Sequence, residues 1–320
     1  MSVVHKNGEA NLQLRVVSKT CVARDIVEFS LESSTGQTLP IWDPGAHIDV
    51  HLPNGISRQY SLMRGSTPDT WKIAVLVENG GRGGSRYLGE QVNVGSVLEV
   101  VGPRNHFPLE PADSYLFIAG GIGVTPLIPM LESCESNQLP WNLIYLGRSI
   151  ETMAYAQALE GLFPGKVQLV PKDTYGPLDI PSAINQVSSE THVYTCGPER
   201  LLVDLERALN NSPERLHLER FHPRDLGTVK PNQAFKVFCQ KSDIELLVEA
   251  DESILMAADF AGIDIPGDCM EGTCGACETK VLAGVVEHRD SVLSSQERLK
   301  SEKIMICVSR SVGDRLVIDL

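Results

Sequence analysis

Four cysteines in the last fifth of the chain have the spacing of metal ligands. Cys269, Cys274 and Cys277 follow the pattern C-x4-C-x2-C, and Cys307 stands further along the chain. This is the ligand spacing of a plant-type [2Fe–2S] cluster, in which four thiolates hold two irons that pass one electron at a time. The spacing therefore predicts a one-electron carrier in this segment.

The residues around these cysteines favour a cluster over two other uses of cysteine. Gly267, Gly272 and Gly275 allow the φ > 0 turns that a backbone wrapped around the sulfurs requires. A structural zinc site is the first alternative, but such sites usually pair two C-x2-C knuckles, whereas Cys307 stands alone. A disulfide framework is the second, and it fits poorly with an N-terminal segment that lacks an apolar export signal.

A glycine-rich segment lies in the middle of the chain, at a predicted strand-to-helix turn. Gly120, Gly121 and Gly123 would let a pyrophosphate approach the backbone at a helix N-terminus. Thr125 could cap that helix, and Pro126 suits its first turn. A tight turn in a buried core is the alternative reading of this motif alone.

Two further turns follow predicted strands of the same segment. Cys196 and Gly197, in T-C-G-P, open a helix after a strand, as a shared cofactor cleft requires. Arg148 and Ser149, after Tyr145, could hold a ribose or an adenylate phosphate, or they could be ordinary solvated loop residues.

A flavin is needed because a hydride donor gives two electrons and the cluster accepts one. The run R-Q-Y-S-L at residues 58–62 reads as a strand, so Arg58 and Tyr60 would share one face and Ser61 would point to the other. A cation could then meet a phosphate while an aromatic ring lies beside the flavin. The turn G-R-G-G-S at residues 81–85 precedes a predicted helix and offers a second anion site.

Predicted elements divide the chain into three segments. Residues 1–112 predict an antiparallel β-barrel with one helix at Ser85–Gln91, and residues 113–222 predict a doubly wound parallel sheet that binds ligands at the carboxyl ends of its strands. Residues 223–234 read as a linker, and residues 235–320 as the metal-binding domain, with a helix at Ser253–Ala261. Expected barrel strands are Leu12–Val17, Val27–Leu31, His47–Leu52, Trp71–Val77 and Val97–Val101. Expected helices of the middle segment are Pro126–Ser136, Thr152–Gly161, Pro181–Gln186 and Glu199–Asn210.

Composition agrees with an ordinary multidomain globular protein. The 320 residues are 42% apolar and 22% charged, with a net charge of −13, so nucleic acid and anionic membranes are poor partners. No apolar run approaches the ~18 residues of a membrane span, and a cytoplasmic monomer is expected. Three other cysteines, Cys21, Cys134 and Cys239, are expected to be buried small side chains.

Taken in order, the motifs resemble those of one family. R-x-Y-S, G-R-G-G-S, G-G-I-G-V-T-P, C-G-P and the cysteine pattern together resemble the phthalate dioxygenase and vanillate O-demethylase reductases, over essentially the whole chain. The resemblance implies a pair of ferredoxin–NADP reductase-like domains followed by a plant-type ferredoxin of the β-grasp fold. It also implies FMN rather than FAD, NADH as the electron donor and a Rieske-type terminal oxygenase as the acceptor.

The resemblance also implies roles for individual residues. The Ser61 hydroxyl would lie near the reactive flavin nitrogen, Thr125 between flavin and nicotinamide, and Cys196 beside the nicotinamide as an element of shape and polarity. Phe221, in L-E-R-F, would cover the flavin. The segment Leu169–Asp173 departs from the family pattern at the expected adenosine contacts. Motifs and resemblance together assign Arg58, Gln59, Tyr60, Ser61, Ile73, Ala74, Val75, Arg82, Gly83, Gly84 and Ser85 to the flavin, and Gly120, Gly121, Gly123, Thr125, Arg148, Ser149, Cys196 and Gly197 to the nucleotide.

The leading hypothesis is an enzyme that passes electrons from NADH to FMN, to the cluster and to an oxygenase. The alternative is a stand-alone reductase that serves a cytochrome or another small carrier. A scaffold with degenerate sites is disfavoured because all four ligand cysteines and both glycine loops are present.

Overall fold

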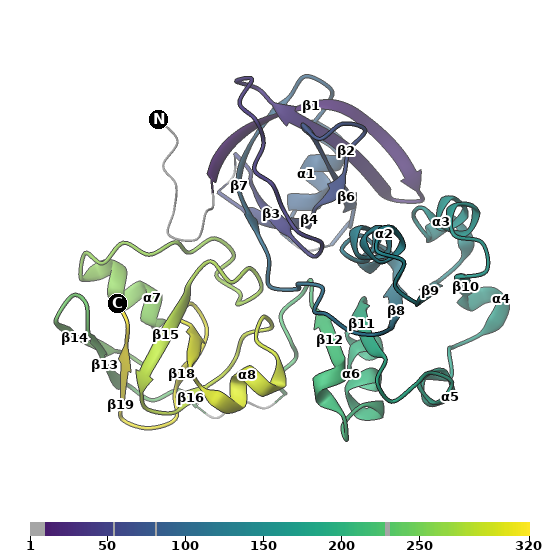
Figure 1. Cartoon of the computed structure of the whole chain (residues 1–320). Helices are drawn as coiled ribbons and strands as arrows, with labels where there is room; N and C mark the ends of the chain where they lie inside the picture. The colour runs from purple at the N-terminus through teal and green to yellow at the C-terminus, as the bar shows by residue number, and fades with distance from the viewer. Residues whose placement is uncertain (1–9, 54, 81, 228–230) are drawn as a thin grey trace. The chain divides into compact units, whose positions relative to one another are not determined.

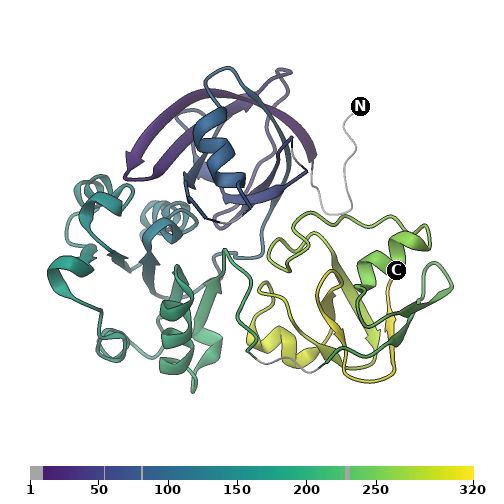
Figure 2. The same ribbon diagram turned by 180° about the vertical axis from the view of Figure 1, so that it is seen from behind.

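The computed structural model describes residues 10–53, 55–80, 82–227 and 231–320. The chain divides into two compact units, Met1–Glu219 and Arg220–Leu320, and Figures 1 and 2 show the elements of each from opposite sides. The first unit contains two large sheets and the second contains one, so the three expected folds are present.

The first sheet of unit one is antiparallel throughout and forms the expected barrel. Its strand order is β4-β3-β7-β1-β2-β6-β5. Side chains on its inner face, among them Leu14, Phe29 and Trp71, are almost fully buried, and α1 (Gly84–Gln91) adds Leu88 to this core. The strands are β1 (Ala10–Ala23), β2 (Ile26–Ser33), β3 (His47–His51), β4 (Ser57–Ser61), β5 (Met63–Arg64), β6 (Thr70–Leu76) and β7 (Val97–Arg104).

The strand expected at Leu12–Val17 is longer in the structure, because β1 continues to Ala23 and pairs with β2 over its whole second half. Side chains beyond Val16 are exposed or half-buried, so the apolar alternation that marks a strand stops although the backbone pairing continues. For the same reason the prediction that Cys21 is buried is wrong, whereas Cys134 and Cys239 are buried.

The second sheet of unit one is entirely parallel, with the order β10-β9-β8-β11-β12. Helices α2 and α3 pack on one face through Leu127 and Leu159, and α5 and α6 on the other through Ile184 and Leu205, as in a doubly wound fold. The strands are β8 (Tyr115–Gly120), β9 (Trp141–Gly147), β10 (Val167–Pro171), β11 (His192–Cys196) and β12 (Leu216–Glu219). The helices are η1 (Gly121–Val124), α2 (Leu127–Ser136), η2 (Ile150–Thr152), α3 (Ala156–Leu162), α4 (Lys172–Tyr175), α5 (Ile180–Asn185), α6 (Glu199–Ala208) and η3 (Pro213–Arg215).

Two expectations for this sheet are wrong. The helix expected at Thr152–Gly161 is broken, because Tyr155 adopts a left-handed conformation with φ 61° and separates η2 from α3. The helix expected to begin at Pro126 begins one residue later, and Thr125 does not cap it; its hydroxyl donates to the Ile122 carbonyl instead, at 3.0 Å. The turn after β8, where a capped helix start was expected, is instead formed by the four residues of η1.

The second unit has the β-grasp arrangement, with the strand order β14-β13-β19-β15-β17. Strands β13 and β19 are parallel, while the other neighbours are antiparallel. Helix α7 packs Ile254 and Ala258 into a core of its own. The elements are β13 (Phe235–Cys239), β14 (Ile244–Val248), α7 (Ile254–Phe260), β15 (Glu278–Ala283), β16 (Val286–Glu287), α8 (Ser295–Lys300), β17 (Lys303–Met305), β18 (Arg310–Ser311) and β19 (Arg315–Ile318).

Within unit one, the barrel and the parallel sheet share a small apolar cluster. Ile26, Met63 and Ala74 of the barrel pack with Ala154, which lies between η2 and α3.

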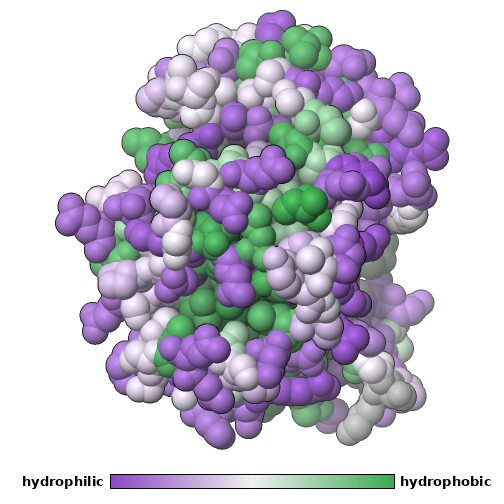
Figure 3. All heavy atoms as spheres, turned by 90° about the vertical axis from the view of Figure 1, so that its right-hand side faces the viewer, coloured by the Kyte–Doolittle hydropathy of each residue, from purple (hydrophilic) through white to green (hydrophobic). Residues whose placement is uncertain are grey.

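The face seen in Figure 3 has apolar atoms gathered in its middle, with polar atoms dominating above and below. No helix in the described part of the chain has the length and apolar character needed to cross a lipid bilayer.

Candidate functional site

The four predicted ligand cysteines come together in unit two. Cys269, Cys274 and Cys277 lie in the loop between α7 and β15, and Cys307 follows β17; all four are buried. The Cys269 thiol contacts those of Cys274 and Cys307, and these hydrogen bonds hold the pKa of Cys269 far below its usual range. Cys277 likewise contacts Cys307. Two close pairs of sulfurs, 269 with 274 and 277 with 307, are what a two-iron cluster requires.

The loop backbone is wrapped around the first cysteine. The N–H groups of Glu271 and Thr273 both donate to the Cys269 sulfur at 3.4 Å. Gly272 and Gly275 have positive φ, as predicted. Gly267 does not, so its predicted reason is wrong: an added Cβ there would lie 2.5 Å from Leu255 Cδ2, and the glycine allows α7 to approach the loop.

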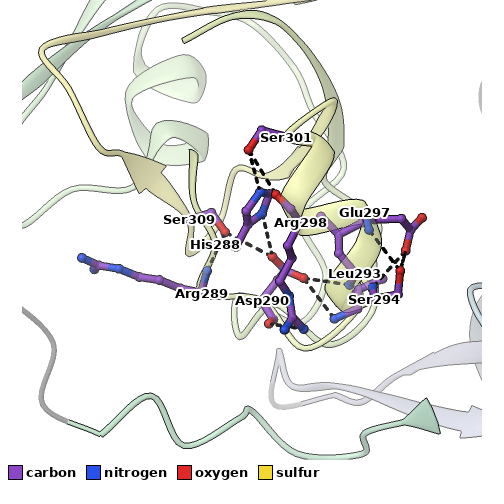
Figure 4. A network of polar contacts seen from close by, with 10 residues as sticks. His288, Arg289, Asp290, Leu293, Ser294, Glu297, Arg298, Ser301 and Ser309 are labelled. Carbon is purple, nitrogen blue, oxygen red and sulfur yellow. Dashed lines mark hydrogen bonds and ion pairs between the residues drawn. The ribbon is translucent and has the colours of Figure 1, made fainter. Parts of the chain in front are cut away.

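A polar network lies in the segment after β16 (Figure 4), and one backbone hydrogen bond joins this segment to the cysteine loop. The buried Asp290 carboxylate accepts a hydrogen bond from the Leu293 N–H at 2.8 Å and lies 3.5 Å from His288 Nδ1. The N–H of Ser291 donates to the Gly272 carbonyl at 2.8 Å. This network therefore fixes the backbone of the cysteine loop at the glycine between its first two ligands.

In the barrel, β4 and the start of α1 build an anion site. An added Cβ at Gly84, the first residue of α1, would lie 2.9 Å from Arg58 Cγ, so the arginine passes directly over the helix N-terminus. Gly83 precedes the helix with φ 85° and no side chain caps it, which leaves its N–H groups available to a ligand. A guanidinium over an uncapped helix start is a fitting site for one phosphate.

The rest of β4 shows which of its residues can reach a ligand. Ser61 is buried and its hydroxyl has no hydrogen-bond partner among the described residues. Tyr60 is held protonated because burial raises the pKa of its phenol. Gln59 is engaged elsewhere, since its amide donates to Asp49, which also pairs with Arg104. A buried hydroxyl without a partner is costly, and the polar edge of a flavin would satisfy it.

The other predicted flavin residues differ in what they expose. Ile73 and Val75 point into the barrel core, and Ala74 joins the apolar cluster with Ala154. The Ser85 hydroxyl accepts a hydrogen bond from the Glu78 N–H at 3.3 Å, and Arg82 is exposed. Gly81 of the same motif lies outside the described residues.

The glycines of the nucleotide loop divide into two kinds. An added Cβ at Gly123 would lie 2.3 Å from the Cys196 carbonyl oxygen, and one at Gly120 would lie 3.2 Å from the Gly197 Cα. Gly120 and Gly123 therefore let the turns after β8 and β11 pack on each other, and their contact with a pyrophosphate stays a prediction. Gly121 differs, because it has φ 57° and open space at its Cβ position.

Two acidic groups meet where β11 and β12 end. Cys196 is fully buried, and burial together with the charge of Glu219 raises the pKa of its thiol. Glu219 lies opposite Cys196 in the parallel register, and burial raises the pKa of its carboxyl to about 8. Its Oε2 is buried without a hydrogen-bond partner in the described part of the chain. At neutral pH the Cys196 thiol and most of the Glu219 carboxyl therefore keep their protons.

Sequence reasoning gave Glu219 no role. It stands two residues before Phe221. The sequence signal that could have found it is a carboxylate in the motif L-E-R-F at the end of a short strand, and that strand pairs with the strand of Cys196. The strand itself was missed, because β12 has only four residues and includes His217.

Three predicted residues remain, and two of them, Arg148 and Ser149, follow β9. The backbone of Ser149 begins η2: its N–H donates to the Thr152 hydroxyl at 3.3 Å, and that hydroxyl donates to the Ser149 carbonyl at 2.8 Å. The N–H of Asp173 donates to the Arg148 carbonyl at 3.1 Å, which brings the start of α4 to the end of β9. Phe221 belongs to unit two and its side chain is 37% exposed.

Comparisons with known proteins agree with this arrangement. Residues 13–108 match the oxidoreductase FAD-binding domain and residues 237–312 the 2Fe-2S iron-sulfur cluster binding domain. The toluene-4-sulfonate monooxygenase system reductase subunit TsaB1 of Comamonas testosteroni is 36% identical, over 97% of this chain and 99% of its own. A solved phthalate dioxygenase reductase is 34% identical with a TM-score of 0.69, over 97% of this chain and 98% of its own.

The chain belongs to the phthalate dioxygenase reductase family. It is an oxidoreductase with a flavin-binding barrel, a nucleotide-binding α/β domain and a [2Fe–2S] ferredoxin domain. A self-sufficient cytochrome P450 monooxygenase is also similar, with 40% identity and a TM-score of 0.89; the match covers 97% of this chain but only 41% of that longer one.

Proposed function

We propose that this reductase takes electrons from NADH through FMN and its [2Fe–2S] cluster to a Rieske-type terminal oxygenase. The observation that supports it best is the pairing of Arg58 with the uncapped start of α1, on the same strand as the unpartnered Ser61 hydroxyl. One phosphate and one flavin ring edge would satisfy both. A bound flavin accepts a hydride and releases its electrons singly.

FMN is proposed over FAD because the phosphate site ends at Arg58. Its guanidinium covers the N-terminus of α1 and also donates to the Ser57 carbonyl at 2.8 Å, which fixes it in place. A second phosphate would need further cations, and the neighbouring turn offers the exposed Arg82 alone among its described residues. Denaturation should release FMN, near one per chain, and recovery of FAD by chromatography would contradict the proposal.

NADH is proposed as the donor on the charges near β9. Arg148 lies beside Asp173 through the hydrogen bond described above, and Glu151 follows in η2. A carboxylate near the ribose 2′-hydroxyl repels the additional phosphate of NADPH. We expect at least about a tenfold preference for NADH in kcat/KM, which is on the order of 1.4 kcal/mol; equal values for the two donors would contradict it.

The predicted site residues would then have distinct roles. Gly121 would admit the pyrophosphate to the backbone of η1, while Thr125 and Cys196 would shape the nicotinamide position. Ser61 would hydrogen-bond the flavin, and Glu219 would hold a proton at its carboxyl near the reacting atoms. Phe221 would cover the flavin ring.

The acceptor is proposed from the relatives. Two of the relatives are the reductases of a toluene-4-sulfonate monooxygenase and of a phthalate dioxygenase. We infer from them that the acceptor is a Rieske-type oxygenase. A haem protein is the second candidate, because a similar sequence forms part of a cytochrome P450 monooxygenase. Reconstitution with a purified Rieske oxygenase, with cytochrome c as a haem comparison, would decide: faster NADH-dependent reduction of the haem protein would favour the second candidate. We further propose a cytoplasmic monomer.

A further inference from the structure

The hydroxyl of Tyr145 lies between two segments of unit one. This tyrosine on β9 is fully buried, and its Oη is 3.1 Å from the Gly121 carbonyl oxygen and 3.0 Å from that of Ala154. Burial raises the pKa of its phenol, so it remains a donor at every working pH. Its single O–H is therefore shared between a carbonyl of the nucleotide loop and a carbonyl of the turn between η2 and α3.

That turn reaches the barrel through its next residue. Tyr155 donates a hydrogen bond to Glu28 Oε2 at 2.9 Å, and Glu28 Oε1 lies 3.1 Å from Lys72 Nζ. Tyr155 has φ 61°, a conformation that costs a residue with a bulky side chain roughly 1 kcal/mol or more. A strained tyrosine that breaks a helix and bonds a carboxylate of the other domain is a feature that the fold alone does not require.

Apolar contacts follow the same path. Ala154 is fully buried against Ile26 and Ala74 of the barrel, and Ile122 of the nucleotide loop packs on this cluster. The loop that carries Gly121 is therefore tied to the barrel by two routes, one polar and one apolar. Only the polar route has directional contacts that can fix a distance.

We propose that Tyr145 and Tyr155 are positioning residues for hydride transfer. The contacts from Gly121 through Tyr145, Ala154 and Tyr155 to Glu28 hold the nucleotide loop at a fixed distance from β2 of the flavin-binding barrel. This inference rests on the proposed function, in which a dihydronicotinamide loses a hydride and the flavin gains it. Such a transfer needs reacting atoms about 3–3.5 Å apart, and small displacements slow it strongly.

The test separates positioning from binding. Tyr155→Phe and Tyr145→Phe remove single hydroxyls, and Tyr175→Phe is the matched control because Tyr175 is 69% exposed on α4. Stopped-flow reduction of the flavin over a range of NADH concentrations gives a limiting rate and a Kd. We expect the limiting rate to fall about tenfold in the two buried variants, with the Kd within about twofold of wild type and no change in the control.

Two results would overturn the proposal. One is an unchanged limiting rate in both folded, flavin-loaded variants; the other is a raised Kd at an unchanged limiting rate, which would assign the tyrosines to binding. If wild-type flavin is reduced by neither NADH nor NADPH, the proposed function itself fails, and this outcome is distinct from both.

Glu28 supplies a second, independent pair of variants. Glu28→Gln keeps an oxygen that accepts the Tyr155 hydrogen bond, whereas Glu28→Leu removes it. The glutamine variant should retain most of the limiting rate and the leucine variant should match Tyr155→Phe, with no further loss in the double variant Tyr155→Phe/Glu28→Leu. Equal loss in both Glu28 variants, or additive loss in the double variant, would contradict the proposal even if one tyrosine variant were too unstable to assay.

Discussion

The Glu219 carboxyl predicts that flavin reduction in this reductase depends on pH. The pKa of Glu219 is raised to about 8 from an ordinary value of 4.5, because its carboxyl is buried beside Cys196. The rate of flavin reduction by NADH should therefore change between pH 7 and pH 9. In Glu219→Gln this step in the pH profile should disappear, and its persistence would show that another group titrates.

Stability should show the same titration with a definite sign. Because the folded-state pKa is above the unfolded one, the unfolded chain loses its proton first, and the free energy of unfolding falls as pH rises from 4.5 to 8. Glu219→Gln should be stabilised relative to wild type, by roughly 3 kcal/mol more at pH 8 than at pH 5. Chemical denaturation at both pH values measures it, with the exposed Glu214→Gln as the control.

At the scale of single residues, motif spacing predicted the ligands that lie close together in the sequence. It missed contacts between residues that only the folded chain brings together. Three of the cysteines converge because their spacing matches a single ligand loop, and β17 brings Cys307 to them. Glu219 was missed because its neighbour Cys196 is adjacent only in the sheet. Gln59 was assigned to the flavin, but its side chain bonds the buried Asp49, a partner that no local pattern reveals.

At the scale of elements, the glycine turns offer a matched comparison. Gly123→Ala would place a Cβ 2.3 Å from the Cys196 carbonyl oxygen, so the turns after β8 and β11 must separate. In Gly121→Ala the new Cβ lies in open space, so the only cost to the free energy of unfolding is the backbone strain of a φ of 57°. We expect Gly123→Ala to lower the free energy of unfolding by about 2 kcal/mol or more and Gly121→Ala by about 1. Equal losses in denaturant titration would contradict this account of the loop.

His217, near the start of β12, predicts that the free energy of unfolding falls on acidification. His217 stacks on Tyr194 with ring centroids 4.3 Å apart, and burial, with a smaller effect of His192, lowers the pKa of His217 to about 4. A depressed histidine pKa means that the unfolded chain takes up the proton first on acidification. The free energy of unfolding should fall by on the order of 2 kcal/mol between pH 6.5 and 4. In His217→Phe that fall should shrink; an identical pH dependence would show that other groups cause it.

Elements with strong periodicity were predicted well, and those set by distant contacts were not. The alternation of strands and helices gave the doubly wound sheet, with small shifts at α2 and α5. The break before α3 depends on Tyr155, whose left-handed backbone is held by a carboxylate on β2 far away in sequence. Local helix propensity cannot predict a partner that is so distant in the sequence.

At the scale of the whole molecule, the cluster and the flavin should fail independently. Cys274→Ala removes a ligand, so cluster absorbance should be lost, while the cores of unit one remain intact. NADH should still reduce ferricyanide, and reduction of cytochrome c or of an oxygenase should collapse. Cys239→Ala, buried in the same unit but not a ligand, is the control and should keep the cluster. Loss of ferricyanide activity in soluble, flavin-loaded Cys274→Ala would contradict this separation.

The division of the chain at residue 220 also has a consequence for its ancestry. Because each unit closes its own core, a gene exchange near this point would leave both halves able to fold. Recombination there could give one flavin module a new ferredoxin without redesigning either interior. The cytochrome P450 monooxygenase described above matches 97% of this chain, so in that longer protein the two units have stayed together.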